Sequence, residues 1–331
     1  MMGRLMRVEL RRYLARQAVR WLVVGMVAAV LLTGFAAWRA SRPPSEAQLA
    51  EAQQQVTLAQ ADWAQHGAEY MTQCRAQQEQ ARQTDPSADF QCDRGAPTVE
   101  SFLPPRQTFA ANAYDSLGQV ATFVLLLSLI VGATFVAAEL STGAMSTWLT
   151  FEPRRGRVFA SKAAVASVVT GTAALAVSVL AVGVLWVATA VNHATGQVEA
   201  QTLVDLGNGS ARIAVAAAGA ALLGAGLGFL LRHTAAVIAS VIAWFIAIDG
   251  ILVSGLLQAP RWAAATNLQA WLRAGTTYYQ QGPCVTDPLG GLACNPVQKT
   301  LPMAAGGLTL VAALAVVAAL AWVVFRRRDV A

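Results

Sequence analysis

The sequence predicts an all-α integral membrane protein with six transmembrane helices, both termini in the cytoplasm, an N-terminal amphipathic helix and a helical extracytoplasmic subdomain between the first two spans. Composition is the first observation behind this prediction. Of the 331 residues, 56% are hydrophobic and 13% are charged, and the mean hydropathy is +0.47. Soluble domains are less apolar and more highly charged. The second observation is a set of long apolar runs, and the third is an uneven distribution of Lys and Arg between them.

The predicted spans each carry at most one charge over about the 20 residues that a bilayer core demands. They cover residues 21–38, 119–138, 163–191, 213–231, 235–257 and 303–325. The remaining segments are a cytoplasmic helix (1–20), an outer subdomain (39–118), a cytoplasmic loop (139–162), the connections between spans three to five within 163–257, an outer loop (258–302) and a tail (326–331). The first span also fits a signal peptide, but Trp38 and Arg39 offer no small-residue cleavage site.

The orientation follows from the basic residues on alternate sides of the spans. With the N-terminus inside, the inner side carries 14 of the 24 Lys and Arg residues and only four of the 18 acids. The short connections agree, because Arg232 fills the turn between spans four and five and 326–328 is an Arg triplet after span six. The positive-inside rule therefore predicts that both termini are cytoplasmic.

All four cysteines fall in the two outer loops, where an oxidising environment favours disulfides. The simplest pairing joins Cys74 to Cys92 and Cys284 to Cys294, one closure in each loop, although four cysteines allow three connectivities. Four free thiols are the plainer alternative. A metal site is disfavoured because no His lies at a ligand spacing from any of them.

The first outer loop is predicted to contain one long helix. Ser45 follows two prolines and can cap it, and the pattern fades near Arg82. Apolar or small residues recur every three or four positions, which defines a stripe: Leu49, Ala52, Val56, Ala59, Trp63, His66 and Tyr70. The stripe is expected to pack either on the returning segment around 102–114 or on a second copy of the chain. In either case His66 is interpreted as a packed residue and not as a ligand.

The second outer loop has a different composition. Aromatic and apolar residues near one face of a short helix suit the bilayer interface; they are Trp262, Leu268, Trp271 and Leu272, followed by Tyr278 and Tyr279. Turn formers then predict a cap that Cys284 and Cys294 would close, namely Pro283, Pro288, Gly290, Gly291 and Pro296. This cap is either a gate or a plain surface tether.

The N-terminal segment has apolar residues on one helical face and arginines on the other. Met6, Leu10, Tyr13 and Leu14 form the apolar face. We expect the helix to lie along the cytoplasmic leaflet with its cations near anionic lipid. Nucleic acid is an unattractive partner, because the helix leads directly into a membrane span.

Motifs for chemistry are missing from the sequence. There is no GxxxxGK[ST] loop, so the chain has no P-loop for a nucleoside triphosphate. The glycines of 224–228 lie inside span four with no preceding strand, which disfavours a dinucleotide site. Gly224 and Gly228 instead form a GxxxG face that lets helices approach closely. We expect no catalytic residues, no metal and no cofactor bound by this chain.

Asp249 is the one acid inside a predicted span, about 12 Å below its outer end at 1.5 Å per residue. An intramembrane carboxylate is a candidate functional residue. Counting along the hairpin of spans four and five places Arg212 nearly level with it, which predicts an ion pair between Arg212 and Asp249. The pair is interpreted as structural, with a substrate- or proton-linked carboxylate and a water-exposed acid as alternatives.

The loop 139–162 is the long polar stretch on the cytoplasmic side. Glu139 marks the end of span two, Ser141 or Thr142 can cap a short helix through Leu149, and Pro153 would stop that helix. Such a helix is a natural docking element. The plainer alternative is a solvated positive loop that binds nothing.

At these residues the chain resembles the ABC-2 type permease family, the membrane subunits of bacterial ABC exporters. The resemblance rests on an acid at the end of span two, a Thr-Gly pair, a helix ending in Leu, a Pro-Arg-Arg run and a basic entry to span three; here these are Glu139, Thr142, Gly143, Leu149, Pro153, Arg154, Arg155 and Lys162. Segments 8–17 and 224–239 add to the likeness, which covers the whole chain. The large outer subdomain departs from a minimal permease.

The resemblance implies a permease in the bacterial cell membrane that depends on a separate ABC ATPase, which binds ATP and Mg, and on a second permease subunit, as a homodimer or a heterodimer. The loop would be the coupling helix. Glu139 and Glu152 would meet basic groups of the ATPase, and Arg154 and Arg155 would anchor lipid phosphates. The cargo would be amphiphilic or hydrophobic, because no charged cluster lines the spans. An alternative function is an ATP-driven mechanical transmitter that acts through the outer helix on an extracytoplasmic partner.

Overall fold

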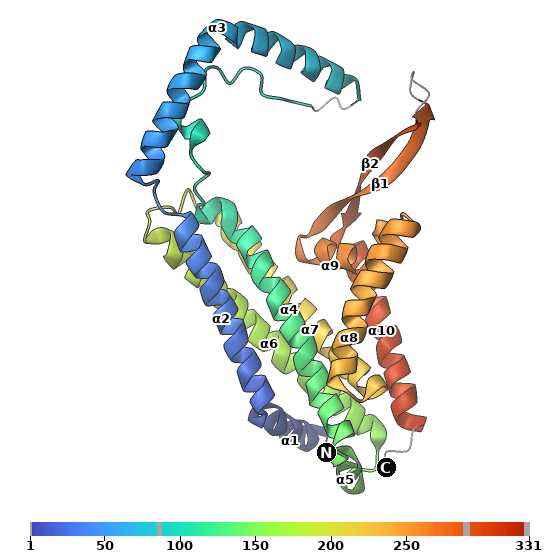
Figure 1. The fold of residues 1–331 in the computed structure, drawn as a ribbon. Coiled ribbons are helices and arrows are strands. Elements are labelled where there is room, and N and C mark those ends of the chain that lie inside the picture. The colour runs from blue at the N-terminus through green and yellow to red at the C-terminus, as the bar shows by residue number, and fades with distance from the viewer. Residues whose placement is uncertain (1, 85–87, 287–291, 328–331) are drawn as a thin grey trace. The chain divides into compact units, whose positions relative to one another are not determined.

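The computed structural model of the chain describes residues 2–84, 88–286 and 292–327. It divides into two compact units, one formed by Met1–Trp38 with Thr108–Ala331 and the other by Arg39–Gln107. The first unit is a helical bundle with a β-hairpin, and the second is built around one long helix (Figure 1).

The bundle contains long helices joined by short ones. In chain order they are α1 (Met2–Ala15), α2 (Gln17–Ala40), α4 (Phe109–Ser141), α5 (Ala144–Phe151), α6 (Arg155–Ala190), α7 (Ala200–Leu231), α8 (Thr234–Ala243), the π-helix η2 (Trp244–Leu256), the 3-10 turn η3 (Pro260–Trp262), α9 (Ala264–Leu272) and α10 (Met303–Arg327). Six of the described helical stretches are long and apolar enough to cross a membrane. They are α2, α4, α6, α7, α8 with η2, and α10, so the six predicted spans all correspond to helices.

The helices extend beyond the predicted spans. α4 has 33 residues and α7 has 32, and α7 begins at Ala200, well before the apolar run 213–231. Their extra turns carry polar residues such as Asn112 and Asp205. Hydropathy locates only the part of a helix that suits lipid, whereas backbone hydrogen bonding continues into the polar turns. The apolar runs predicted as these two spans are therefore parts of longer helices.

The core of the bundle is formed by α4, α6 and α7. Of the apolar stretch in α4, 61% is buried within the protein, compared with 22% in α2 and 11% in α10, so α4 is central and the latter two are peripheral. Small residues bring α4 and α7 close together: a Cβ on Gly224 would overlap the Leu129 carbonyl, and one on Gly228 would lie 3.2 Å from the Ala133 oxygen. The GxxxG face thus packs within the chain, against α4.

The second outer loop contains an antiparallel hairpin that the sequence did not predict. Strands β1 (Gly275–Thr286) and β2 (Leu292–Pro302) pair from Gly275 opposite Pro302 to Thr286 opposite Leu292. The expected turn-rich cap is wrong for the described residues: Pro296 pairs opposite Gln281, and Pro283 falls in a register shift. A two-stranded sheet has only edge strands, where a missing N–H is tolerated.

The backbone register sets Cys284 directly opposite Cys294. Their side chains lie outside the described part of the structure, so the predicted disulfide between them stays a prediction. Pro288, Gly290 and Gly291 also lie outside the described residues.

The other unit contains the predicted long helix and one of the predicted disulfides. α3 (Glu46–Thr84) has 39 residues, and Ser45 caps it reciprocally with Gln48: the Gln48 N–H donates to Ser45 Oγ and the Ser45 N–H donates to Gln48 Oε1. Cys74 and Cys92 are bonded and close an 18-residue separation. This bridge ties the second half of α3 to its own return segment.

The stripe on α3 is covered only near its start. Ala52 and Val56 are buried, and the 3-10 turn η1 (Val99–Phe102) packs on α3. His66 is not packed as expected. Its Nδ1 lies 3.0 Å from Oδ1 of the exposed Asp62. The Tyr70 hydroxyl donates to Oδ2 of the same carboxylate at 3.0 Å, and this hydrogen bond raises the pKa of Tyr70.

Candidate functional site

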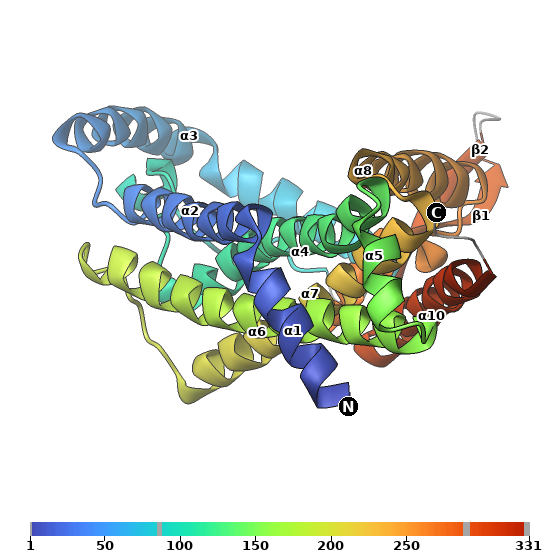
Figure 2. The same ribbon diagram turned by 90° about the horizontal axis from the view of Figure 1, so that it is seen from below.

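The site is the end of the bundle that carries α5, which we call the α5 end. Figure 2 looks onto it: α1 crosses α6, and α5 joins α4 to α6. α5 begins after Gly143, whose φ of 73° lies in the left-handed region that favours glycine. It ends at Phe151, two residues beyond the predicted end at Leu149, and Pro153 follows it.

The residues expected to cap α5 do something else. The hydroxyls of Ser141 and Thr142 both donate to the Ala138 carbonyl, at 3.1 and 2.8 Å, so they satisfy the last turn of α4. Gly143 occupies the N-cap position of α5 without a side-chain hydrogen bond. The expectation that Ser141 or Thr142 caps α5 was wrong, because the chain turns through a left-handed glycine and the hydroxyls face backwards.

α5 has one inner and one outer face. Met145 is completely buried, and Trp148 and Leu149 pack against the same apolar cluster as Phe135 and Val158. On the outer face Thr147 and Thr150 are exposed, and Phe151 is 79% exposed. A large aromatic side chain left open beside two hydroxyls is a typical feature of a contact surface.

Behind α5 lies a buried group of charges from three helices. Lys162 of α6 is completely buried, and its Nζ lies 3.0 Å from Glu9 Oε2 of α1 and 2.7 Å from Glu139 Oε2 of α4. Glu9 is also fully buried and Glu139 is 3% exposed. The Lys162 ammonium lies 4.4 Å from the centre of the Phe135 ring. The ammonium ion therefore bridges two carboxylates from elements far apart in the sequence.

Two arginines complete this charge cluster, which we define as Glu9, Arg12, Arg16, Glu139 and Lys162. Arg16 occupies the break between α1 and α2; its guanidinium donates to Glu139 at 2.6 Å and to the Thr134 carbonyl at 2.9 Å. Arg12 lies 3.7 Å from Glu139 and 3.8 Å from Glu9, and its guanidinium stacks 4.7 Å above the Trp148 ring. Through this stack the cluster reaches α5.

The cluster contains three cations and two carboxylates, so its members are not all compensated. Glu9 Oε1 and Arg12 Nη1 are buried without a hydrogen bond, and the contact of Lys162 with Glu139 is an ion pair without hydrogen-bond geometry. Buried ion pairs contribute little net stability, because desolvation offsets most of the attraction. Removing one partner is costly, so the cluster fixes the relative positions of α1, α4 and α6.

A buried tyrosine flanks the cluster. The Tyr13 hydroxyl of α1 and the Thr170 hydroxyl of α6 are 2.6 Å apart, and the Tyr13 ring meets Phe135 edge to face. Burial raises the pKa of Tyr13 from 10.0 to about 12, against smaller opposing effects of Thr170 and Arg16. Tyr13 is therefore neutral at physiological pH and holds α1 to α6 as an uncharged hydrogen-bonding group.

These contacts correct several expectations. Tyr13 was assigned to the lipid-facing stripe and Arg12 and Arg16 to the lipid headgroups, but all three face the protein interior. Glu139 was expected to meet the ATPase, yet it is buried among cations. The sequence did hold two signals that were missed: Glu9 is the only acid in α1, and Lys162 is one of two lysines in a chain that otherwise uses arginine.

The Pro-Arg-Arg run has mixed surroundings. Arg154 is exposed. Arg155, expected at lipid phosphates, donates instead to the Phe325 carbonyl at 3.1 Å and so binds the last turn of α10. Glu152 is partly buried, and one of its oxygens lies 3.9 Å from Arg157. Arg155 thus ties α10 to the start of α6, because a cation suits the carbonyls at a helix C-terminus.

The predicted intramembrane pair is not formed. Both residues are in the described part of the chain, and no ion pair joins them there. Arg212 donates to the Tyr114 hydroxyl at 2.9 Å, while Asp249 accepts from the Trp244 ring N–H at 3.2 Å and the Ala265 backbone N–H at 2.9 Å. The count along the hairpin failed because η2 does not continue along α7; it packs instead on α8, η3 and α9, so Asp249 faces α9.

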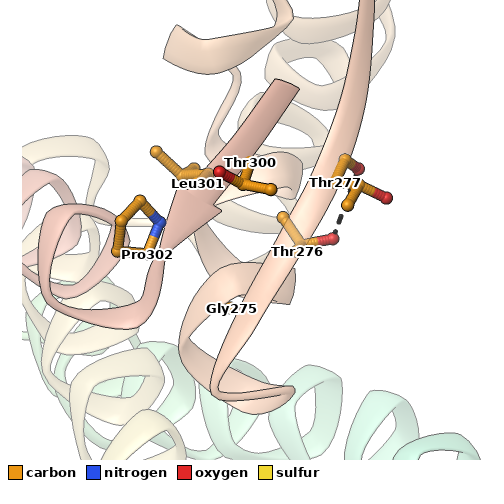
Figure 3. A pocket seen from close by; sticks show the side chains of 6 residues that line it. All are labelled: Gly275, Thr276, Thr277, Thr300, Leu301 and Pro302. Atoms are coloured by element: carbon orange, nitrogen blue, oxygen red, sulfur yellow. Dashed lines mark hydrogen bonds between the residues drawn. The ribbon is translucent and has the colours of Figure 1, made fainter. Parts of the chain in front are cut away.

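The opposite end of the bundle holds a pocket of about 310 Å³ at the foot of the hairpin (Figure 3). Its lining is Gly275, Thr276, Thr277, Thr300, Leu301 and Pro302. None of these side chains titrates near neutral pH. The pocket therefore offers apolar surface and hydroxyls but no acid, base or cation.

The six apolar helices and the buried charges at one end of the bundle define a multi-pass membrane protein. No family model, no curated protein and no solved structure matches the chain.

Proposed function

We propose that the chain is the permease subunit of an ABC exporter and that its ATPase partner docks on α5. The observation that carries this proposal is the construction of α5: a short helix with an open outer face, joined through Trp148 and Arg12 to the charge cluster. A partner that pushes on α5 pushes on α1, α4 and α6 together. Rigid-body movement of packed helices is a recognised way to transmit such a push through a protein.

The resemblance of segment 139–162 to ABC-2 permeases supports the same function. In this view the partner supplies ATP and Mg, because the chain has no P-loop. The docking surface consists of Thr147, Thr150 and Phe151, since Glu139 is committed to the charge cluster. A second permease subunit, identical or related, completes the exporter, and the cargo is amphiphilic or hydrophobic.

The α5 end is proposed to lie in the cytoplasm of a bacterial cell, with both termini there. The outward face of α1 supports contact with the inner leaflet. It exposes Met6, Leu10 and Leu14 next to Arg7 and Arg11. Apolar side chains flanked by cations suit an anionic lipid surface.

The test is purification of the tagged chain from its native membrane. The proposal expects an ATPase subunit to co-purify, and it expects Phe151→Asp to abolish that association and the ATP hydrolysis that accompanies it. Leu58→Asp on α3 is the matched control, because Leu58 is 74% exposed and remote in sequence from α5. If the wild-type chain brings no ATPase, or if Phe151→Asp retains it, the assignment fails.

A mechanical transmitter is the second candidate. The observation that favours it is α3, a helix of 39 residues that a disulfide joins to its return segment and whose stripe is exposed at Tyr70. Such a helix suits an extracytoplasmic partner. The two functions separate when the complex is reconstituted in vesicles: a transmitter hydrolyses ATP without moving any cargo, whereas an exporter moves it.

A further inference from the structure

The short helix α9 is held at both of its ends by groups from other helices. At its N-terminus, Asp249 Oδ2 accepts the Ala265 backbone N–H at 2.9 Å, while Oδ1 accepts the Trp244 ring N–H at 3.2 Å. Asp249 is 5% exposed, so these bonds account for a carboxylate that is otherwise withdrawn from solvent. A negative charge at a helix N-terminus also matches the helix dipole.

The C-terminus of α9 is held by α4 and α7. The Tyr114 hydroxyl donates to the Leu272 carbonyl at 3.1 Å, and Arg212 donates to that hydroxyl at 2.9 Å. The Trp271 ring N–H donates to the Arg212 carbonyl at 3.0 Å. The cation of Arg212 thus acts on the carbonyl end of α9 through Tyr114, which is the end where positive charge is favourable.

Between its two ends, α9 packs closely against two glycines of α10. A Cβ added to Gly306 would approach the Ala270 Cβ and the Asn267 carbonyl to 2.8 Å, and one added to Gly307 would approach the Trp271 ring to 2.8 Å. Ala270 and Asn267 are both buried. The close fit depends on the absence of side chains on α10 at these two positions.

The segments on either side of α9 have backbone conformations that L-residues rarely adopt. Gln258, before it, has a φ of 47°, and Ala274, directly after it, has a φ of 61°. Neither is glycine. Each follows the C-cap of a helix, η2 or α9, where the left-handed conformation is common and glycine is the usual residue, so a residue with a Cβ must be held there by its surroundings. The preceding η2 is a π-helix, a form that is also frequent at functional sites.

We propose that α9 is a hinged latch at the hairpin end of the bundle, held on α10 by Asp249 at one end and by Tyr114 with Arg212 at the other, and turning at Gln258 and Ala274 when it opens. Asp249 and Arg212 do not form an ion pair, because each acts on a different end of the α9 dipole. Opening would separate α9 from α7 and α10 and would carry the β-hairpin with it, since β1 follows α9 directly (Figure 1). The inference does not rest on the proposed transport function.

Hydrogen–deuterium exchange of the full chain in lipid nanodiscs tests the latch. Asp249→Leu removes the N-terminal fastening, and it is expected to raise the exchange rate of amides 264–272 on the order of ten- to a hundredfold, the factor for losing a hydrogen bond to a charged group. Amides 120–137 in the buried part of α4 are expected to keep their wild-type rates. Unchanged exchange in α9, or an equal increase in both segments, would overturn the proposal.

A second variant tests the packing of α9 on α10. Gly306→Val places a side chain where α9 packs, and it is expected to raise the exchange rate of amides 264–272 selectively while leaving Asp249 unchanged. Gly183→Val on α6 is the matched control, because a Cβ at Gly183 meets nothing within 4 Å. The latch is refuted if Gly306→Val leaves α9 exchange at the rate of the Gly183→Val control.

Discussion

Replacing Lys162 by methionine is the sharpest test of the charge cluster. Methionine is unbranched and nearly as long as lysine, so it fills most of the same space, but it removes the ammonium and with it the cation–π contact with Phe135. Two carboxylates are then left buried without their shared cation. Glu139 keeps Arg16 at 2.6 Å, whereas the nearest cation to Glu9 in the described structure becomes Arg12 at 3.8 Å.

The magnitude follows from these distances. At an effective dielectric constant of about 20, each Lys162 contact is worth about 5–6 kcal/mol of Coulomb energy before desolvation, since the charges are 2.7 and 3.0 Å apart. Desolvation of the ammonium offsets much of this. The expected net loss is about 3–5 kcal/mol in the free energy of unfolding, the usual cost of leaving a buried charge without its partner.

The assay is reversible unfolding in mixed detergent micelles, followed by tryptophan fluorescence. Lys299→Met is the matched control, because Lys299 is the other lysine of the chain and is exposed on β2; it should change the stability by less than about 0.5 kcal/mol. Adding Glu9→Gln to Lys162→Met should restore most of the loss by removing the uncompensated carboxylate. A Lys162→Met protein within about 1 kcal/mol of wild type, or a double variant less stable than the single one, would refute the reasoning.

Three further outcomes are expected. Because burial raises the pKa of Tyr13 to about 12, the unfolded chain loses the Tyr13 proton at a lower pH than the folded chain does. The wild type should therefore lose up to about 2–3 kcal/mol of its free energy of unfolding between pH 10 and 12. Unfolding curves measured over this pH range should show a smaller loss for Tyr13→Phe. Gly224→Ala should reduce the free energy of unfolding by about 2–3 kcal/mol, seen as a lower melting temperature, because the new methyl group overlaps the α4 backbone. Gly219→Ala on the same helix is the control, since its methyl group meets one side chain at an ordinary 3.7 Å. Equal melting temperatures for the two variants would contradict the packing. Cys74→Ser should destabilise the outer unit by about 3 kcal/mol, seen as faster proteolysis within 39–107, and a reductant should have the same effect on wild type but none on the variant.

The sequence predicts the existence of the helices well because lipid imposes a simple requirement. Apolar length located all six spans, and the capping residue Ser45 and the disulfide of Cys74 with Cys92 were also found correctly. Helix ends were placed less well, since polar turns continue α4 and α7 beyond the apolar runs. The hairpin is not evident from the sequence, because the prolines and glycines of this loop indicate turns more strongly than the β-branched and aromatic residues of 276–279 indicate a strand.

The candidate site was only half visible in the sequence. The turn, its glycine and its proline could be located, but the direction of each charged side chain could not. A helical pattern separates arginines from apolar residues, and it does not say that Arg12 and Arg16 turn inward toward acids from α1 and α4. The contacts of Arg16 with Glu139 and of Lys162 with Glu9 join residues more than 100 positions apart, and they depend on the three-dimensional packing of α1 against α4 and α6.

The separation of Glu9 from Lys162 has a consequence for biosynthesis. These residues are 153 positions apart, so at about 5–20 residues per second the ribosome makes the acid roughly 8–30 seconds before the base. During that interval α1 has no bundle to dock on and its acid has only neighbouring arginines. Lys162, in turn, has only Glu139 of α4 as an acidic partner until α1 packs against α6. The ion pair between Glu9 and Lys162 can therefore form only after the chain has been made as far as α6, so α1 cannot complete its docking on the bundle before then.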